Sequence, residues 1–246
     1  ISDVDNDSIL DEVDNCPNSA NTNQLDTDGD NIGDVCDSDI DGDGILNDSD
    51  AFPLDPNESV DTDNDGIGNN ADTDDDGDGM SDEWEIANGL NSIDSSDSHT
   101  DPDGDGVNNI TEYQHGSDPR NVDTDGDEVP DGWEIEYGFN PIVPEIPDEI
   151  GDADGDGLAD KLEYFANTNP TVVDSDNDGM ADGWEYHNGL NPSDSSDSHT
   201  DVDNDGVNNI TEFEHGTNPQ RIDTDGDGVP DGWEIEYGFN PIVPEI

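Results

Sequence analysis

The 246-residue sequence predicts a mostly irregular tandem repeat array with short α-helices and no conventional hydrophobic core. Three observations predict this fold class. Apolar residues are too few for a packed core, one acidic template recurs along the chain, and residues 179 to 246 nearly copy residues 79 to 146. We therefore expect an elongated rod of small units, each of which is ordered locally.

The charge balance excludes several classes of function. The chain has 70 Asp and Glu against three Lys and Arg, a formal charge of -67, and only 27% hydrophobic residues. This composition is typical of disordered chains and argues against most ordinary enzymes. Nucleic acid and anionic membranes would be repelled, and no apolar run approaches the roughly 20 residues that cross a bilayer. We expect no nucleic-acid partner and no membrane insertion, and cations as the natural counterpart.

The acidic residues follow a fixed template, DxDxDxxx[DN]xx[DE], which occurs 11 times with starts 13 to 29 residues apart. Between the two copied blocks, 52 of 68 positions are identical. A disordered acidic tail would scatter its charges or run them in blocks, so the recurring intervals favour an ordered array. Position 6 is Gly in eight copies, with Ser8, Asn31 and Glu128 in the others, and position 7 is always apolar.

The template suits a loop like that of an EF-hand, with the DxDxDG pattern. Carboxylates at positions 1, 3 and 5 can turn inward, the position 7 carbonyl adds an oxygen, and the acid at position 12 can bind in bidentate fashion. This is the oxygen shell that Ca²⁺ prefers, and glycine at position 6 permits the bend with positive φ. Magnesium demands a strict octahedron, and transition metals would require Cys or His at regular positions. The spacing therefore predicts calcium.

The predicted calcium ligands occupy positions 1, 3, 5, 9 and 12 of every loop. In the first four loops they are Asp3, Asp5, Asp7, Asp11, Asp14, Asp26, Asp28, Asp30, Asp34, Asp37, Asp39, Asp41, Asp43, Asn47, Asp50, Asp61, Asp63, Asp65, Asn69 and Asp72. In the next three they are Asp74, Asp76, Asp78, Asp82, Glu85, Asp101, Asp103, Asp105, Asn109, Glu112, Asp123, Asp125, Asp127, Asp131 and Glu134. In the last four they are Asp152, Asp154, Asp156, Asp160, Glu163, Asp174, Asp176, Asp178, Asp182, Glu185, Asp201, Asp203, Asp205, Asn209, Glu212, Asp223, Asp225, Asp227, Asp231 and Glu234.

Calcium can replace the missing core. Two carboxylates about 4 Å apart repel by roughly 4 kcal/mol at an effective dielectric near 20, so an empty loop is expected to open. Free calcium about a hundredfold above the dissociation constant would stabilise each loop by about 2.7 kcal/mol. Eleven ions supply 22 positive charges and reduce the formal charge from -67 to -45. We therefore expect a calcium-stapled array with about 11 or more ions.

A short helix is expected after each loop from about residue 74 onward. In the segment DGWEIEYGFNP, Asp131 and Glu134 have capping-box spacing, Trp133 and Tyr137 lie one turn apart, and Gly138 can end the helix. Equivalent endings are expected at Gly89, Gly116, Gly189 and Gly216. Capping competes with ion binding for the two acids, but the same spacing recurs in the second loop, where no helix is expected. That recurrence favours the ion.

The pattern divides the chain into four parts. Residues 1–72 hold four loops and both cysteines, residues 73–146 and 173–246 hold the loop-helix blocks, and residues 147–172 form a connector with one loop. Each block ends in the apolar segment PIVPEI, which we expect to be an extended spacer. The alternative is an edge or docking strand that joins neighbouring units.

Two sets of residues resemble known repeats. The stretch DNCPNSANTNQLDTDGDNIGDVCDSDIDGDGI, residues 14–45, resembles the thrombospondin type 3 repeat, and later copies such as DTDGDGVPDGWEIEYGFNP resemble its cysteine-free bacterial variety. The resemblance implies an extracellular calcium-loaded array with the ligand positions named above. It also implies a disulfide between Cys16 and Cys36, which would contribute on the order of 3 kcal/mol. The later copies depart from the pattern in lacking Cys and in placing Glu at position 12.

The disulfide and the calcium sites predict the same compartment. A disulfide requires an oxidising environment, and weak calcium sites fill at the millimolar calcium found outside cells. We therefore expect a secreted or cell-surface protein, and the bacterial variety of the repeat predicts a bacterial source.

The preferred function is structural: a rigid extracellular rod, the stalk of a surface protein, or a fibre subunit that self-associates. The alternative is a calcium-dependent adhesin or binding module for a glycan, a matrix protein or a mineral. A calcium sensor would expose an apolar groove, which the scarcity of Met and Leu disfavours. Ser95, Asp97 and His99 lie in one polar connector without an oxyanion hole or apolar cleft, so we expect no enzyme.

Overall fold

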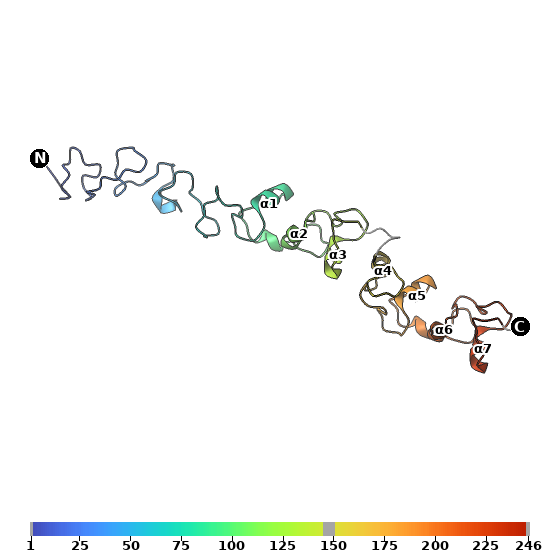
Figure 1. Cartoon of the computed structure of the whole chain (residues 1–246). Coiled ribbons are helices and arrows are strands. Elements are labelled where there is room, and N and C mark those ends of the chain that lie inside the picture. The colour runs from blue at the N-terminus through green and yellow to red at the C-terminus, as the bar shows by residue number, and fades with distance from the viewer. Residues whose placement is uncertain (1, 145–150, 245–246) are drawn as a thin grey trace. The chain divides into compact units, whose positions relative to one another are not determined.

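The computed structural model describes residues 2–144 and 151–244 (Figure 1). Over these ranges it has short helices and no strand. The α-helices are α1 (Asp82–Asn88), α2 (Asn109–His115), α3 (Asp131–Tyr137), α4 (Asp160–Ala166), α5 (Asp182–His187), α6 (Asn209–His215) and α7 (Asp231–Tyr237). Three 3-10 turns are η1 (Asn47–Ser49), η2 (Asp97–His99) and η3 (Asp197–His199). The predicted irregular repeat array with short helices is confirmed.

The chain forms two compact units. One comprises residues 1–103, 108–114 and 118–120, and the other comprises residues 104–107, 115–117 and 121–246. The boundary falls within a single loop-helix repeat. The division of the sequence into four parts stays a prediction.

Each α-helix begins at position 9 of its loop, but not in the way the sequence predicts. The N-cap of α3 is Pro130, which has no side-chain oxygen, and Asp131 is the first helical residue. The Asp131 carboxylate accepts hydrogen bonds from the backbone amide and the hydroxyl of Thr124, at 2.8 and 2.6 Å. The predicted capping box of Asp131 and Glu134 is therefore wrong, because the Asp131 side chain closes its own loop instead.

The helix ends follow the prediction with one exception. Gly138 has φ 84°, and the next amide, of Phe139, donates to the carbonyl of Glu134 at 2.7 Å, as in a Schellman motif. The C-caps at Gly89, Gly138 and Gly216 are confirmed, and Gly116 also has a positive φ. α5 is the exception in its assigned bounds, since its last residue is His187 and its C-cap is Asn188, but Gly189 has φ 72° and the Leu190 amide donates to the Glu185 carbonyl at 2.9 Å, as at the other glycine ends.

The described part of each PIVPEI segment is a turn. Val143 N donates to the carbonyl of Asn140 at 3.0 Å, and Val243 N donates to that of Asn240 at 3.2 Å. Residues 141–144 and 241–244 are therefore not the extended spacer that was predicted, while residues 145, 146, 245 and 246 lie outside the described residues.

Carboxylates occupy much of the interior of the repeats. Among the described residues the buried hydrophobic side chains are Cys16, Met80, Val129, Leu158 and Met180. The position 12 glutamates are at least as well buried, with at most 1% of the residue exposed: Glu85, Glu112, Glu134, Glu163, Glu185, Glu212 and Glu234. An ionised carboxylate is costly to bury without a counter-charge, so the fold is built around groups that need one.

Candidate metal centres

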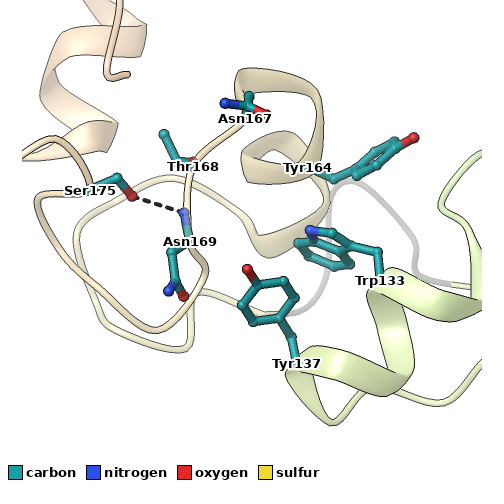
Figure 2. Close-up of a pocket in the computed structure, with 7 residues that line it drawn as sticks. All are labelled: Trp133, Tyr137, Tyr164, Asn167, Thr168, Asn169 and Ser175. Carbon is teal, nitrogen blue, oxygen red and sulfur yellow. Dashed lines mark hydrogen bonds between the residues drawn. The ribbon is translucent and has the colours of Figure 1, made fainter. Parts of the chain in front are cut away.

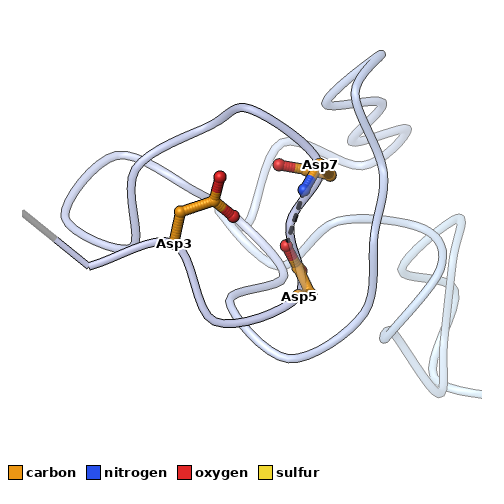
Figure 3. Close-up of side chains that lie close together, drawn as sticks. All are labelled: Asp3, Asp5 and Asp7. Carbon is orange, nitrogen blue, oxygen red and sulfur yellow. Dashed lines mark hydrogen bonds between the residues drawn. The ribbon is translucent and has the colours of Figure 1, made fainter.

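The acidic side chains at loop positions 1, 3 and 5 converge. In the first loop, one carboxylate oxygen from each of Asp3, Asp5 and Asp7 lies within 4.8 Å of the others, and Figure 3 shows the three side chains along one turn of the chain. The same holds for the triplets that begin at Asp26, Asp39, Asp61 and Asp74, and eight further groups of metal-ligating side chains meet this limit. The template thus brings its first three acids together.

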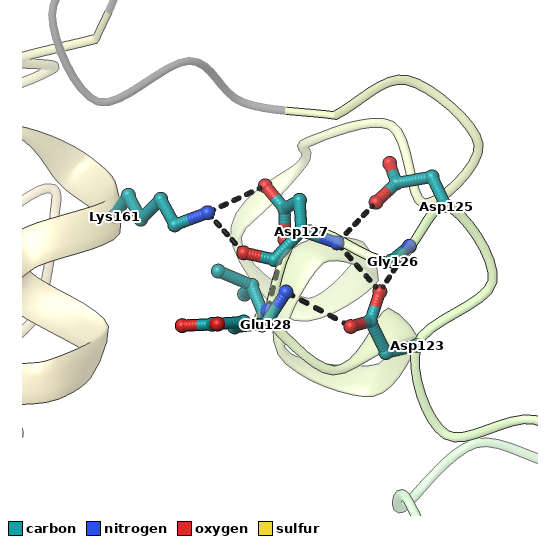
Figure 4. Close-up of polar contacts among 7 residues, drawn as sticks. Asp123, Asp125, Gly126, Asp127, Glu128 and Lys161 are labelled. Atoms are coloured by element: carbon teal, nitrogen blue, oxygen red, sulfur yellow. Dashed lines mark hydrogen bonds and ion pairs between the residues drawn. The ribbon is translucent and has the colours of Figure 1, made fainter.

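Backbone amides hold these carboxylates in place. In the loop that starts at Asp123, the amides of Gly126 and Glu128 donate to the two oxygens of Asp123, at 2.7 and 2.9 Å (Figure 4). The amide of Asp127 donates to Asp125 Oδ1 at 3.2 Å, and the position 7 amide donates to Asp127 Oδ1 at 2.8 Å. Because the loop's own amides fix all three side chains, their charges are kept close together in spite of their repulsion.

Position 9 closes the loop. In nine of the 11 loops its side-chain oxygen accepts a hydrogen bond from the position 2 amide, as Asp34 does from Thr27 at 2.8 Å. In the other two loops, Asn109 and Asn209 donate through Nδ2 to the carbonyls of Asp97 and Asp197, at 2.8 Å. Position 9 therefore has a structural role, and its role as a metal ligand stays a prediction.

The position 12 glutamates lie beside the aspartates of their loops. Burial raises the pKa of Glu85, Glu163 and Glu212 to about 8 and that of Glu185 to about 9, and the charges of the loop aspartates add to the shift. No residue in the described ranges donates a hydrogen bond to the side-chain oxygens of Glu85 or Glu185. Such a carboxylate needs a proton or a cation beside it. Because the charged groups that act on Glu85 and Glu185 are aspartate carboxylates, whose oxygens are ligands that Ca²⁺ prefers, the site suits a hard cation such as Ca²⁺.

Two functional features escape a reading of the sequence. Lys161, on α4, places Nζ 3.3 Å from Asp127 Oδ2 and also donates to the Asp127 carbonyl (Figure 4). Asp97 starts η2 in the polar connector. Burial and the charge of Asp78 raise the pKa of Asp76 to about 6, and the charge of Asp97 adds a smaller increase there and at Glu85. One signal in the sequence could have pointed to Asp97. The segment DSSDSHTD recurs at residues 94–101 and 194–201, and in both cases the loops on its two sides start 27 residues apart.

The two cysteines form the predicted disulfide. The Cα atoms of Cys16 and Cys36 are 5.8 Å apart, and the bond spans 20 residues of sequence. The bond ties the end of the first loop to the end of the second.

Aromatic side chains pack across the loop-helix repeats and line one pocket. Trp84 lies 5.1 Å from Tyr113 between ring centroids, and Trp133 lies 5.6 Å from Tyr164. A pocket of about 340 Å³ in the second unit is lined by Trp133, Tyr137, Tyr164, Asn167, Thr168, Asn169 and Ser175 (Figure 2). Ser175 Oγ accepts a hydrogen bond from Asn169 N at 2.8 Å, which fixes the polar wall of the pocket opposite the rings.

Comparisons with known proteins agree with this geometry. The family described as thrombospondin type 3 repeat matches residues 2–24 and 25–59. The family described as bacterial TSP3 repeat matches residues 74–92, 101–121, 152–172, 174–195, 201–221 and 223–244, which together make up just over half of the chain. None of the described helices is long and apolar enough to cross a membrane.

Two curated relatives match shorter stretches. Thrombospondin-4 of Xenopus laevis is 68% identical over 34 residues, which are 14% of this chain and 4% of that protein. Cartilage oligomeric matrix protein of Mus musculus is 54% identical over 41 residues, 17% of this chain and 5% of that protein. The chain thus spans no more than 5% of the length of these relatives.

Proposed function

Because the chain belongs to the thrombospondin type 3 repeat family, whose repeats bind calcium, we propose that it is an extracellular structural protein ordered by its bound ions. The aspartates at positions 1, 3 and 5 and the acid at position 12 would supply the ligands in each loop. When bound, calcium supplies the positive charge that these carboxylates lack. The residues of the chain hold the ligands in register through the amide and position 9 hydrogen bonds described above.

One observation supports this proposal most directly. Most of the large, fully buried side chains of the loop-helix repeats are glutamates, and the charges of nearby aspartates act on Glu85 and Glu185. Ionising Glu85 or Glu185 without a counter-charge would cost roughly 3–5 kcal/mol each, because both are fully buried and no donor from the described residues reaches their oxygens. A divalent ion in each loop resolves this conflict, and it makes calcium a structural component.

The finer role that we propose is a rod, a stalk of a surface protein, or the subunit of a fibre. The repeats stack short units whose own apolar cores are too small to fold alone, so bound ions would set both their order and their stiffness. We further propose a secreted or cell-surface location in a bacterium. The disulfide and the match to the bacterial repeat support this location.

The test is a chelator titration of the full chain. Circular dichroism and small-angle scattering would be followed while EGTA removes calcium, with magnesium added back as the control for ion identity. We expect helical signal to be lost, the dimensions to change, and calcium alone to restore both. Unchanged profiles at saturating EGTA would refute the proposal.

The aromatic pocket favours a second candidate, an adhesin that binds a glycan. Aromatic rings beside amide and hydroxyl groups suit the mixed apolar and polar faces of a sugar, and Trp133, Tyr137 and Asn169 supply both kinds of surface. Glycan-array binding of the full chain that is lost in Trp133→Ala would support this role. The matched control is Trp233→Ala, which alters the equivalent residue of the last helix. Equal binding by both variants, or none by the wild type, would exclude the pocket.

A further inference from the structure

In most loop-helix repeats, Oδ2 of the position 5 aspartate accepts a hydrogen bond or an ion pair from the following repeat. The Gly amides at the start of the next helix supply it in three pairs: Gly132 to Asp105 Oδ2 at 2.7 Å, Gly183 to Asp156 Oδ2 at 2.6 Å, and Gly232 to Asp205 Oδ2 at 2.7 Å. At Asp127 the ammonium of Lys161 takes this place (Figure 4). Each of these junctions, by which we mean the contact between the position 5 aspartate of one repeat and the next repeat, therefore pairs a carboxylate with a hydrogen-bond donor or a positive charge.

Asp78 and Asp178 depart from this arrangement. Their following segment is the polar connector, which presents Asp97 and Asp197 at the start of η2 and η3. Oδ2 of Asp78 and Oδ1 of Asp97 are both buried, and within the described part of the chain neither receives a hydrogen bond. The same is true of the corresponding atoms in the second copy. At these two positions, the position 5 aspartate therefore lacks the donor that it has in the other repeats, and the connector that follows it carries a second unpartnered carboxylate oxygen.

The connector aspartates are held rigidly. The amide of Asn91 donates to Asp97 Oδ2 at 2.9 Å, and Asn109 Nδ2 donates to the Asp97 carbonyl at 2.8 Å. Asn191 and Asn209 make the same two bonds to Asp197, at 2.9 and 2.8 Å. One side-chain oxygen and the carbonyl of Asp97 are thus engaged by residues before and after the connector, which leaves Oδ1 without a partner among the described residues.

A fully buried glutamate lies in the same cluster. Glu85 is 0% exposed, no donor from the described residues reaches its two oxygens, and the charges of Asp76, Asp78 and Asp97 all raise its pKa. In the second copy, Glu185 is equally buried, and the charge of Asp178 raises the pKa of Asp197. The connector aspartate and the loop aspartates thus lie close enough to act on the same buried glutamate, and each contributes a buried carboxylate oxygen that no described residue bonds.

We propose that a divalent cation bridges Asp78 to Asp97 in the first unit and that another bridges Asp178 to Asp197 in the second. The inference deepens the proposed function and rests on it, with calcium as the ion. The cation replaces the amides and the Lys161 ammonium of the other junctions and ties the connector to the loop before it. Asp97 and Asp197 thereby become metal ligands that lie outside the 12-residue template.

The test uses the full chain with Asp97→Asn and Asp197→Asn together. Calcium binding is measured by competition with a chromophoric chelator, and thermal unfolding is followed in calcium and in EGTA. We expect two ions to be lost or bound at least tenfold more weakly, and a lower melting temperature in calcium. The matched control is Asp94→Asn with Asp194→Asn, which removes the same charge from exposed positions of the same connector and should bind like the wild type.

The sign of the stability change separates the bridge from simple repulsion. If no cation lies between the paired aspartates, replacing one of them by Asn relieves repulsion and raises the melting temperature in calcium. That result, or wild-type calcium number and affinity in the double variant, would overturn the inference. Asp97→Glu with Asp197→Glu keeps the carboxylates and should retain more calcium than the Asn variant. Failure of the wild type itself to bind calcium would instead reject the proposed function, and the bridge with it.

Discussion

The loops of residues 2–72 and those of residues 74–244 share one acidic template but complete it differently. In the first region position 12 is Asp, and one of its side-chain oxygens accepts a hydrogen bond from the backbone amide two residues later. Asp37 accepts this bond from Asp39 at 2.9 Å, and Asp50 accepts it from Phe52 at 2.8 Å. In the second region position 12 is a buried Glu on a helix. The first region therefore completes its loops with local hydrogen bonds, whereas the second brings a charge into its interior.

The apolar residue at position 7 shows the same contrast. Ile32, Ile45 and Ile67 of the first region are at least 40% exposed, whereas Met80 and Met180 of the second are 1% exposed. The second region thus buries this side chain, and the first region has the disulfide instead. Stability should therefore depend on the cross-link in the first region and on charge neutralisation in the second.

The largest expected effect is that of pH on the calcium-free second region. Burial raises the pKa of Glu85, Glu163 and Glu212 to about 8 and that of Glu185 to about 9, against an ordinary value of 4.5, so the folded state binds more protons than the unfolded state between these limits. Stability without calcium should accordingly fall as pH rises from about 4.5 to about 8. Circular dichroism in EGTA should show more helix at pH 5 than at pH 8.

Calcium should reverse this dependence, because the ion and the proton compete for the same carboxylates. Calcium affinity should rise over the same pH interval. Calcium-free helix that is equal at both pH values would show that the glutamates are not buried as described.

The next largest effect is expected from Glu85→Gln. Removing one charge from a buried ionic cluster costs about 3–5 kcal/mol, so calcium binding by that loop should weaken by more than a hundredfold and α1 should lose order in hydrogen exchange. The control Glu83→Gln changes an exposed acid of the same helix and should leave both unchanged. Similar losses in the two variants would contradict the difference in burial.

Removal of the disulfide should affect only the first region. Cys16→Ser with Cys36→Ser is expected to destabilise that region by about 3 kcal/mol, because the unfolded chain regains the freedom of a 20-residue loop. Hydrogen exchange followed by mass spectrometry should accelerate over residues 14–45 and stay unchanged over α3 to α7. Acceleration throughout the chain would show that the cross-link has a wider role.

The smallest effect comes from position 6, where Glu128 has φ 83° in one block and Gly228 has φ 99° in the other. A non-glycine residue in this left-handed region is strained, so Glu128→Gly should stabilise the second unit by about 1 kcal/mol. Gly228→Glu should destabilise it by a similar amount, measured by calcium-saturated thermal unfolding. Equal and like-signed shifts in the two variants would exclude backbone strain as the cause.

The sequence predicted those parts of the fold that depend on short spacings. The 12-residue template predicted the loops, the C-cap glycines predicted most helix ends, and the family resemblance predicted the bond between Cys16 and Cys36. The capping box failed because Asp131 is the first helical residue, and its carboxylate is bonded by the amide and hydroxyl of Thr124, seven residues earlier. Local spacing shows which groups are available but not which partner each will bind.

The part of the site that could not be predicted comes from contacts across repeats. Asp97 lies 19 residues from Asp78 in sequence and outside the template, and nothing in its own neighbourhood marks it as acting on that loop. Lys161 and Gly132 likewise acquire their roles from aspartates in the preceding repeat. These roles depend on how one repeat packs on the next, which an acidic template alone does not specify.

The central claim is that divalent ions fill the positions that apolar side chains occupy in most folded chains. A high-resolution map of calcium-soaked protein, with anomalous data to identify the ion, tests it most directly. We expect density 2.3–2.6 Å from the position 1, 3, 5 and 12 carboxylates of each loop. Well-ordered loops around water, with protonated glutamates and no anomalous signal, would contradict it.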